Sequence, residues 1–344
     1  MAAGLALGLV GVGRIGAFHA QTLLALDDVS SVTIADADPA RARRVATELG
    51  VETAETPETL VDAGIEALVI ATATPGHGPL LRLAAQAQLP AFCEKPVALD
   101  LPTMDLVRDE VAKARIVVQV GFQRRFDAGY LAAHEAVAAG AVGRVLVMRA
   151  ATHDPVSPPA DYIAASGGIF SDLHIHDFDA VRFVSGEEIT EVYADGAALD
   201  AQWVNELDDV DVAAAILQLS GGGLVLVSGT RRDPLGYDVR LEVFGTGDSI
   251  VVGQDARSPI RSVEPDARPR RGSAYRDFWD RFEPAYRNEL AAFVETVRTG
   301  APSPCSLDEA RAALTVALAA ERSRAERRPV SIEEVGLAQS PQKG

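Results

Sequence analysis

Three glycines at positions 11, 13 and 16 directly follow an apolar run, residues 5–10, and this arrangement constrains the fold more than any other feature. A continuous apolar run is typical of a strand that is buried on both faces of a parallel sheet. In the pattern G-x-G-x-x-G, the first glycine makes a tight turn, the second lets the backbone approach a pyrophosphate, and the third lets helix pack on strand. The pattern is weak alone, but here it follows a strand and opens a helical stretch, residues 16–26. The chain is therefore predicted to begin with a dinucleotide-binding βαβ unit, with Gly11, Gly13, Arg14, Ile15 and Gly16 at the cofactor.

An aspartate ends the second predicted strand, residues 31–35. Asp36 comes 20 residues after Gly16, where an acid binds the ribose hydroxyls of the adenosine half and favours NAD over NADP. The alternative is a solvated loop acid. The arginines at 41, 43 and 44 could meet a 2′-phosphate, but the exposed face of a helix beginning at Asp38-Pro39 explains them.

The first third of the chain alternates strand and helix. Further buried strands are predicted at residues 67–71, 90–93 and 116–120, with helical patterns between them. Such alternation predicts an α/β fold with a doubly wound parallel sheet. We place this NAD-binding domain at residues 1–121.

The pattern changes after this point. Strands are predicted at residues 144–152, 189–198, 210–219, 224–230, 238–244 and 249–252, with helices at 167–184, at 284–298 and from 306. Glycines at 221–223 and 245–247 lie between neighbouring strands and favour hairpin turns. We expect an α+β domain with a large open mixed or antiparallel sheet at residues 122–335, a surface loop at 254–273, and a tail at 336–344.

Charge and composition exclude several function classes. The 344 residues carry a net charge of −17, which argues against nucleic acid and against an anionic membrane surface. No apolar stretch is long enough to span a membrane. Two distant cysteines, Cys93 and Cys305, favour reduced thiols over a disulfide framework, and we expect a cytoplasmic protein.

Two further segments carry side chains suited to chemistry. Glu94-Lys95-Pro96 follows the fourth predicted strand, and ligands of open α/β sheets bind beyond the carboxyl ends of the strands. The alternative for Lys95 is a surface lysine paired with Glu94. On the helix predicted at 167–184, Asp172 and His176 lie one turn apart. A carboxylate at that position can orient an imidazole and stabilise its protonated form.

The same segment also invites a metal interpretation, because Asp172, His174, His176 and Asp177 lie close together in sequence. On a helix, however, His174 faces away from residues two positions distant. No cysteine or third histidine lies nearby in the sequence. We therefore expect no metal site.

These motifs make the chain resemble the Gfo/Idh/MocA oxidoreductase family, and within it the inositol dehydrogenases. The resemblance covers nearly the whole chain. It is carried by the glycine motif, Ala73-Thr74-Pro75 with His77, Glu94-Lys95-Pro96, residues 121–127, the segment from Asp172 to His176, and Gly236-Tyr237-Asp238.

The resemblance implies a Rossmann domain followed by an open-sheet domain, assembled as a homotetramer through the sheet faces. It implies that Lys95, Asp172 and His176 are catalytic. It further implies that Thr74, His77, Glu94 and Lys95 contact the cofactor, that Arg124, His153 and Tyr237 line a polyol pocket, and that the Lys95–Pro96 peptide bond is often cis.

The expected activity is NAD-dependent oxidation of a secondary alcohol on a cyclitol, most simply myo- or scyllo-inositol to the inosose. Neutral His176 would take the hydroxyl proton, Asp172 would hold the imidazole, and Lys95 would hydrogen-bond the same oxygen, although Lys95 and His176 could exchange roles. Alternatives are a sugar dehydrogenase, including one for a sugar phosphate, a hydrolase or lyase that recycles bound NAD, and a non-enzymatic NAD sensor. A sensor would need none of the three catalytic residues.

Overall fold

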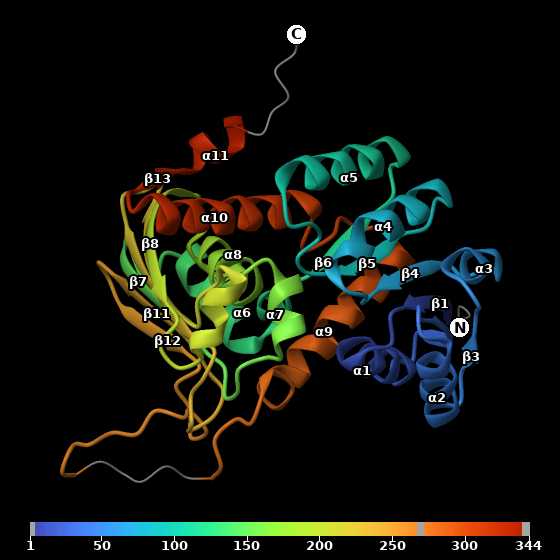
Figure 1. Ribbon diagram of the computed structural model, residues 1–344, viewed down its shortest axis with the longest axis horizontal. Helices are drawn as coiled ribbons and strands as arrows, with labels where there is room; N and C mark the ends of the chain where they lie inside the picture. Colours follow the sequence, from blue (N-terminus) through green and yellow to red (C-terminus); the bar gives the residue numbers. More distant parts are fainter. Residues whose placement is uncertain (1–3, 267–271, 339–344) are drawn as a thin grey trace. The chain divides into compact units, whose positions relative to one another are not determined.

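The computed structural model describes residues 4–266 and 272–338. The chain divides into two compact units, Met1–Gln123 with Pro284–Arg311, and Arg124–Glu283 with Ala312–Gly344. Each unit is built around its own sheet (Figure 1). In the described residues, no helix is long and apolar enough to cross a membrane.

The first unit holds a six-stranded sheet in the order β3-β2-β1-β4-β5-β6. All five strand pairs are parallel, as the alternating pattern predicted. The strands are β1 Leu5–Val10, β2 Val29–Ala35, β3 Glu52–Thr53, β4 Ala67–Ile70, β5 Ala91–Glu94 and β6 Val118–Gly121; the helices are α1 Arg14–Leu24, α2 Pro39–Leu49, α3 Pro57–Asp62, α4 His77–Gln86 and α5 Leu101–Ala114. The order reverses direction at β1 and β4, which is where ligands of such sheets bind.

The core of the first unit also takes in a helix from the far end of the sequence. Leu290, Phe293 and Val294 of α9 (Phe278–Thr299) pack with Leu7 and Phe92 of the sheet, and all five are buried. This packing places Pro284–Arg311 in the first unit, whereas the sequence-based division assigned residues 122–335 to the second domain. Helix α9 packs into this core because its apolar stripe must be buried against another element.

The second unit holds a seven-stranded sheet in the order β12-β11-β7-β10-β9-β8-β13. Its strands are β7 Val145–His153, β8 Ile189–Ala197, β9 Val212–Leu219, β10 Leu224–Thr230, β11 Asp238–Gly245, β12 Ser249–Val252 and β13 Val330–Ser331. Only the β7–β10 pair of this sheet is parallel in the described residues. The predicted mixed sheet is confirmed, and so are the hairpins at residues 221–223 and 245–247.

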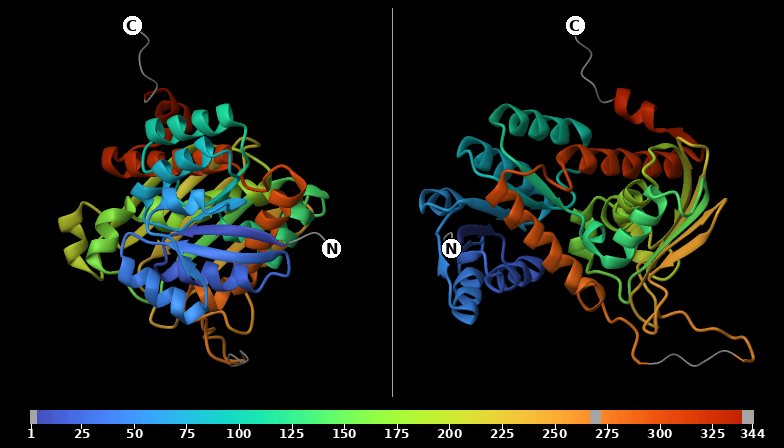
Figure 2. Two further views of the ribbon diagram at one scale, coloured as in Figure 1. Left: turned by 90° about the vertical axis from the view of Figure 1, so that its right-hand side faces the viewer. Right: turned by 180° about the vertical axis from the view of Figure 1, so that it is seen from behind.

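One face of this sheet is covered by helices and the other carries none among the described residues. Helices α6 Ala128–Ala138, α7 Ala160–Ser166 and α8 Ile175–Ser185 lie on the covered side (Figures 1 and 2). On β9 and β10, buried and exposed residues alternate, as expected for a half-buried strand. Helices α10 Leu307–Glu326 and α11 Ile332–Ala338 complete the chain as described.

Three predicted boundaries need correction. The helix expected at 167–184 begins later, because Gly167 and Gly168 have φ of 82° and 89°, and its first part, Phe170–His174, is a π-helix that leads into α8. Helix α9 begins at Phe278 instead of residue 284, since Phe282 continues its buried stripe. The predicted tail, residues 336–344, is helical to Ala338, and its remainder lies outside the described residues.

Candidate active site

The turn between β1 and α1 is shaped by its glycines. Gly11 has φ of 91°, a conformation that suits glycine. A Cβ added to Gly16 would lie 1.7 Å from the carbonyl oxygen of Gly11, whereas one added to Gly13 would meet nothing within 4 Å. Gly16 therefore allows close packing, and Gly13 leaves open space beside the first turn of α1. The free N–H groups of a helix N-terminus favour a phosphate in such a space.

Asp36 stands directly beside this turn. Its Oδ2 accepts a hydrogen bond from the backbone amide of Val12 at 2.7 Å, and its Oδ1 accepts one from the amide of Asp38 at 2.8 Å. The guanidinium of Arg41 lies 3.3 Å from Oδ1. Arg41 was expected on the exposed face of its helix; its side chain is 42% exposed and also pairs with Asp36. The acid is thus built into the nucleotide turn, which disfavours the alternative of a solvated loop acid.

The segment Glu94-Lys95-Pro96 lies at the carboxyl end of β5, and its Lys95–Pro96 peptide bond is cis. Oε1 of Glu94 lies 2.6 Å from Nε2 of His19 on α1, and both side chains are buried. The carboxylate therefore has a histidine partner. Lys95 is half-buried.

His77 and Thr74 lie at the start of the fourth helical segment. The two ring nitrogens of His77 lie 2.8 Å and 2.9 Å from the carbonyl oxygens of Pro96 and Thr72. Burial lowers the pKa of His77, whereas its hydrogen bonds to the two carbonyl oxygens act to raise it. His77 therefore ties two loops together, and its contact with the cofactor stays a prediction. Thr74 lies half-buried in a short 3-10 turn, Thr74–Gly76.

In the second unit, three polar residues lie side by side at the ends of neighbouring strands. His153 ends β7, and its register partners are Thr230, which ends β10, and Asp238, which begins β11. Tyr237 immediately precedes Asp238 and is buried. Nδ1 of His153 lies 3.0 Å from Oγ1 of Thr230. Burial lowers the pKa of His153 and raises that of Tyr237, so both side chains are uncharged and can hydrogen-bond a hydroxyl.

Arg124 belongs to a buried hydrogen-bond network next to these strand ends. Its Nη1 donates to Oδ1 of Asp177 at 2.5 Å, and its Nη2 donates to Oγ1 of Thr152 at 2.9 Å. Oδ2 of Asp177 lies 2.8 Å from Nδ1 of His174. Burial alone would raise the pKa of Asp177, but the Arg124 guanidinium and His174 outweigh it and the pKa is lowered. Arg124 is 1% exposed, so its predicted contact with a substrate stays a prediction.

Asp172 and His176 lie on the π-helix and on the first turn of α8. The phenol of Tyr162 donates to Oδ1 of Asp172 at 2.8 Å, and Nη1 of Arg231 donates to Oδ2 at 3.1 Å. His176 is half-buried. Residues four apart no longer share a strict α-helical face across a π turn, because its hydrogen bonds join residues five apart.

Several members of these networks were not singled out as site residues from the sequence. Tyr162, Asp209 and Arg231 belong to no motif, and Asp177 was considered only as a metal ligand. No local signal could have found them, because each pairs with a residue on another element. Among the described residues, no group of three or more His, Cys, Asp or Glu side chains is placed to hold a metal ion.

Two protein-family models match this chain. Residues 5–122 match the model of an oxidoreductase family with an NAD-binding Rossmann fold, and residues 130–251 match the C-terminal domain of GFO/IDH/MocA proteins. The chain belongs to the Gfo/Idh/MocA oxidoreductase family. The predicted fold class and family are therefore confirmed.

Relatives within the Gfo/Idh/MocA family match over almost the whole chain. The chain is 38% identical over 332 residues to a myo-inositol 2-dehydrogenase of Thermotoga maritima, covering 96% of this chain and 99% of the relative. It is 36% identical over 331 residues to a scyllo-inositol 2-dehydrogenase (NAD(+)) of Bacillus subtilis, covering 94% and 95%.

A solved structure agrees. Scyllo-inositol dehydrogenase from Lactobacillus casei, with bound NAD(H) and scyllo-inositol, superimposes with a TM-score of 0.88 at 26% identity, covering 96% of this chain and 99% of the other. The chain, as a member of the Gfo/Idh/MocA family, is an NAD-binding oxidoreductase. The open space beside Gly13 and the acid at Asp36 fit that cofactor.

Proposed function

We propose that the protein oxidises a secondary alcohol on a cyclitol, myo- or scyllo-inositol, to the inosose. This proposal rests on one observation, made at the ends of strands β7 and β11 in the second sheet. There the side chains of His153 and Tyr237 are uncharged and can form hydrogen bonds, and they lie beside the segment that contains Asp172. Such groups suit the hydroxyls of a neutral polyol. The names of the relatives, inositol 2-dehydrogenases, support the same substrate class.

In this proposal His176 is the general base. Its half-buried imidazole takes the hydroxyl proton as the C–H bond breaks, and Asp172 stabilises the imidazolium that forms. General acid–base assistance of this kind is worth roughly 10²–10⁴-fold in rate. NAD, when bound, accepts the hydride.

Lys95 is proposed to hydrogen-bond the alcohol oxygen. A protonated lysine favours the negative charge that develops on this oxygen as its proton leaves. Glu94, whose Oε1 lies 2.6 Å from His19, is proposed to contact the cofactor together with Thr74 and His77. Arg124, His153 and Tyr237 are proposed to bind the remaining ring hydroxyls.

An NADH-linked assay tests the function. The wild-type protein should form NADH with myo- or scyllo-inositol and not with a sugar panel. His176→Ala and Lys95→Ala should each lower kcat by about 10²-fold or more, and His176→Ala should still bind NAD. Lys113→Ala, which removes an exposed lysine on α5, is the matched control and should act like wild type. Equal turnover in His176→Ala would disprove the assignment of the base.

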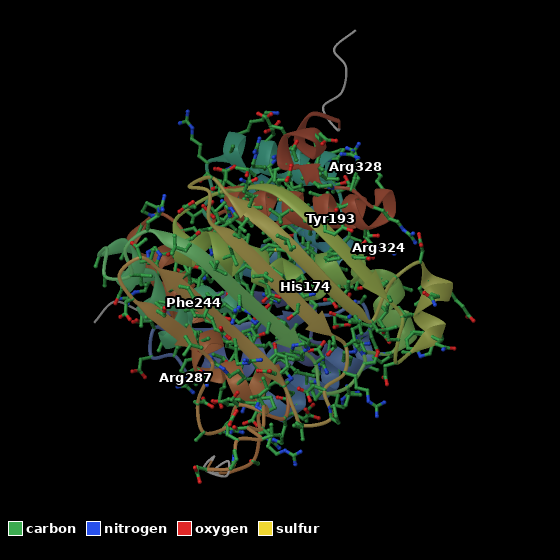
Figure 3. All side chains as sticks on the ribbon, turned by 90° about the vertical axis from the view of Figure 1, so that its left-hand side faces the viewer. His174, Tyr193, Phe244, Arg287, Arg324 and Arg328 are labelled. Atoms are coloured by element: carbon green, nitrogen blue, oxygen red, sulfur yellow. The ribbon has the colours of Figure 1, made fainter. Side chains whose placement is uncertain are left out.

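We also propose that the protein associates with further copies of itself. The uncovered face of the second sheet exposes Leu146, Tyr193, Ile216, Leu224, Leu226 and Val251. Figure 3 looks onto this sheet, with Tyr193 and Phe244 labelled. Contiguous apolar side chains on a sheet face favour burial against another surface. We therefore propose a homotetramer assembled through these faces.

A cytoplasmic location is also part of the proposal. Cys93 and Cys305 are buried free thiols, as expected where thiols stay reduced. Cell fractionation with an antibody against the protein checks this point.

A further inference from the structure

The carboxylate of Asp172 is held at both of its oxygens. Tyr162 of α7 donates its phenolic hydrogen to Oδ1 at 2.8 Å, and Arg231, which follows β10, donates from Nη1 to Oδ2 at 3.1 Å. These two donors come from elements on either side of Asp172 in the sequence, and their hydrogen bonds restrain the carboxylate from two directions.

Arg231 is itself fixed in place. It is fully buried, and its backbone amide donates to the carbonyl of Asp211 at 2.8 Å. Its Nη2 donates to Oδ2 of Asp209 at 3.3 Å, and Oδ1 of Asp209 accepts the backbone amide of Ile169 at 3.0 Å. Arg231 is therefore linked to Asp172 in two ways. Its guanidinium binds the Asp172 side chain directly, and through Asp209 it is connected to the backbone of Ile169, just before Asp172.

The two groups that donate hydrogen bonds to Asp172 both keep their donating hydrogens. Burial would lower the pKa of Arg231, but Asp172, Asp209 and Asp154 outweigh it and the pKa is raised, so Arg231 stays charged. Burial and the neighbouring Asp172 raise the pKa of Tyr162, so its phenol stays protonated and can donate. One cation and one neutral donor therefore face Asp172, and Asp209 and Asp154 are the further carboxylates that interact with them.

We propose that Tyr162 and Arg231 are positioning residues that hold the carboxylate of Asp172 as an oriented anion, so that in the reaction the proton goes to His176 and not to Asp172. The inference rests on the proposed function, in which Asp172 and His176 form the acid–base pair. Hydrogen bonding to the charged form of a carboxyl group lowers its pKa. Removing either donor should therefore raise the pKa of Asp172.

The decisive experiment measures the pKa of Asp172 without substrate. The full-length protein is labelled with ¹³C at the aspartate carboxyl carbons, and the Asp172 signal is assigned by its loss in Asp172→Asn. In Tyr162→Phe this pKa should rise by about one unit, the size expected for one lost hydrogen bond to a charge. The matched control is Tyr275→Phe, because the Tyr275 phenol donates to Asp255 at 2.6 Å on an exposed segment; there Asp172 should titrate as in wild type.

Kinetics supply a second readout. In Tyr162→Phe, kcat with inositol should fall about tenfold, the KM for NAD should stay unchanged, and the acid limb of the pH profile should move to higher pH. Arg231→Gln should move it further, since Asp172 and Asp209 would then repel each other, and Arg231→Lys should restore part of the loss. A residue with a merely structural role would lower the melting temperature without moving the limb.

The outcomes separate the two proposals. An unchanged Asp172 pKa in Tyr162→Phe overturns the positioning inference, whether or not the protein oxidises inositol. A wild-type protein that forms no NADH with any cyclitol refutes the proposed function, and the ¹³C titration then still decides whether Tyr162 holds the Asp172 anion. If Arg231→Gln does not fold, Tyr162→Phe alone decides the question, because this change removes only one hydroxyl group.

Discussion

The backbone amide of Val12 donates a hydrogen bond to the carboxylate of Asp36 at 2.7 Å. This contact joins the middle of the glycine-rich turn to the acid that follows β2, two features that lie 24 residues apart in the sequence. Because the bond uses Oδ2 and the amide of Asp38 uses Oδ1, the carboxylate is oriented before any nucleotide arrives. Its remaining acceptor sites can then meet the ribose hydroxyls without reorganisation.

Asp36→Asn is expected to weaken NAD binding. An amide cannot accept from both ribose hydroxyls as the carboxylate can, and loss of charged hydrogen bonds of this kind costs roughly 1.5–3 kcal/mol, about a tenfold to hundredfold rise in Kd. The Kd is measured by quenching of protein fluorescence. The control is Asp38→Asn, since asparagine keeps the N-cap of α2; comparable weakening in this variant would contradict a specific role for Asp36.

Alanine at two of the motif glycines should separate packing from binding. In Gly16→Ala, the new Cβ would lie 1.7 Å from a backbone oxygen, so α1 must shift and the melting temperature should fall by several degrees. In Gly13→Ala, the Cβ meets nothing within 4 Å, so the melting temperature should hold while the KM for NAD rises, because the methyl group occupies the approach of the pyrophosphate. A normal KM in the Gly13 variant would argue against phosphate binding there.

Asp177→Asn should destabilise the protein strongly. It leaves the buried guanidinium of Arg124 without its anionic partner, and breaking a buried pair costs roughly 3–5 kcal/mol. Urea unfolding measures the loss, with Glu242→Gln as the control, because the Arg149–Glu242 pair is exposed and should contribute about 1 kcal/mol or less.

The same residue predicts an acid dependence of stability. Arg124 and His174 overcome the effect of burial and hold the pKa of Asp177 below its ordinary value. This stabilisation is therefore fully present above the unfolded pKa, about 3.9, and is lost as the pH falls through the lower folded pKa. Urea unfolding between pH 6 and the acid transition should show a shallower pH dependence in Asp177→Asn than in wild type; identical slopes would contradict the assignment.

Leu226→Asp should dissociate the proposed tetramer. Its side chain is 45% exposed on the uncovered face of the sheet, so a charge there disrupts an interface and leaves the isolated fold intact. Sedimentation velocity should show smaller species than in wild type. Leu235→Asp, at a similarly exposed leucine outside the strands, is the matched control, and equal dissociation in both variants would exclude the sheet face as the interface.

Much of the first unit could be predicted from local patterns. The glycine turn, the buried strands and the position of Asp36 are encoded in short stretches, since an apolar run, a turn residue and a spacing act over a few residues. The residue types of the proposed catalytic site, Lys95, Asp172 and His176, were also visible as motifs.

The partners of those residues were decided by the tertiary structure. Arg231 pairs with Asp172 across 59 residues of sequence, and Arg124 pairs with Asp177 across 53. Helix α9 joins the first unit because its apolar stripe fits that core. Such pairings depend on which elements the packed core brings together. A pattern of neighbouring residues in the sequence does not indicate which distant elements these are. The sequence therefore indicates which side chains can do chemistry, and the fold determines which charges surround them.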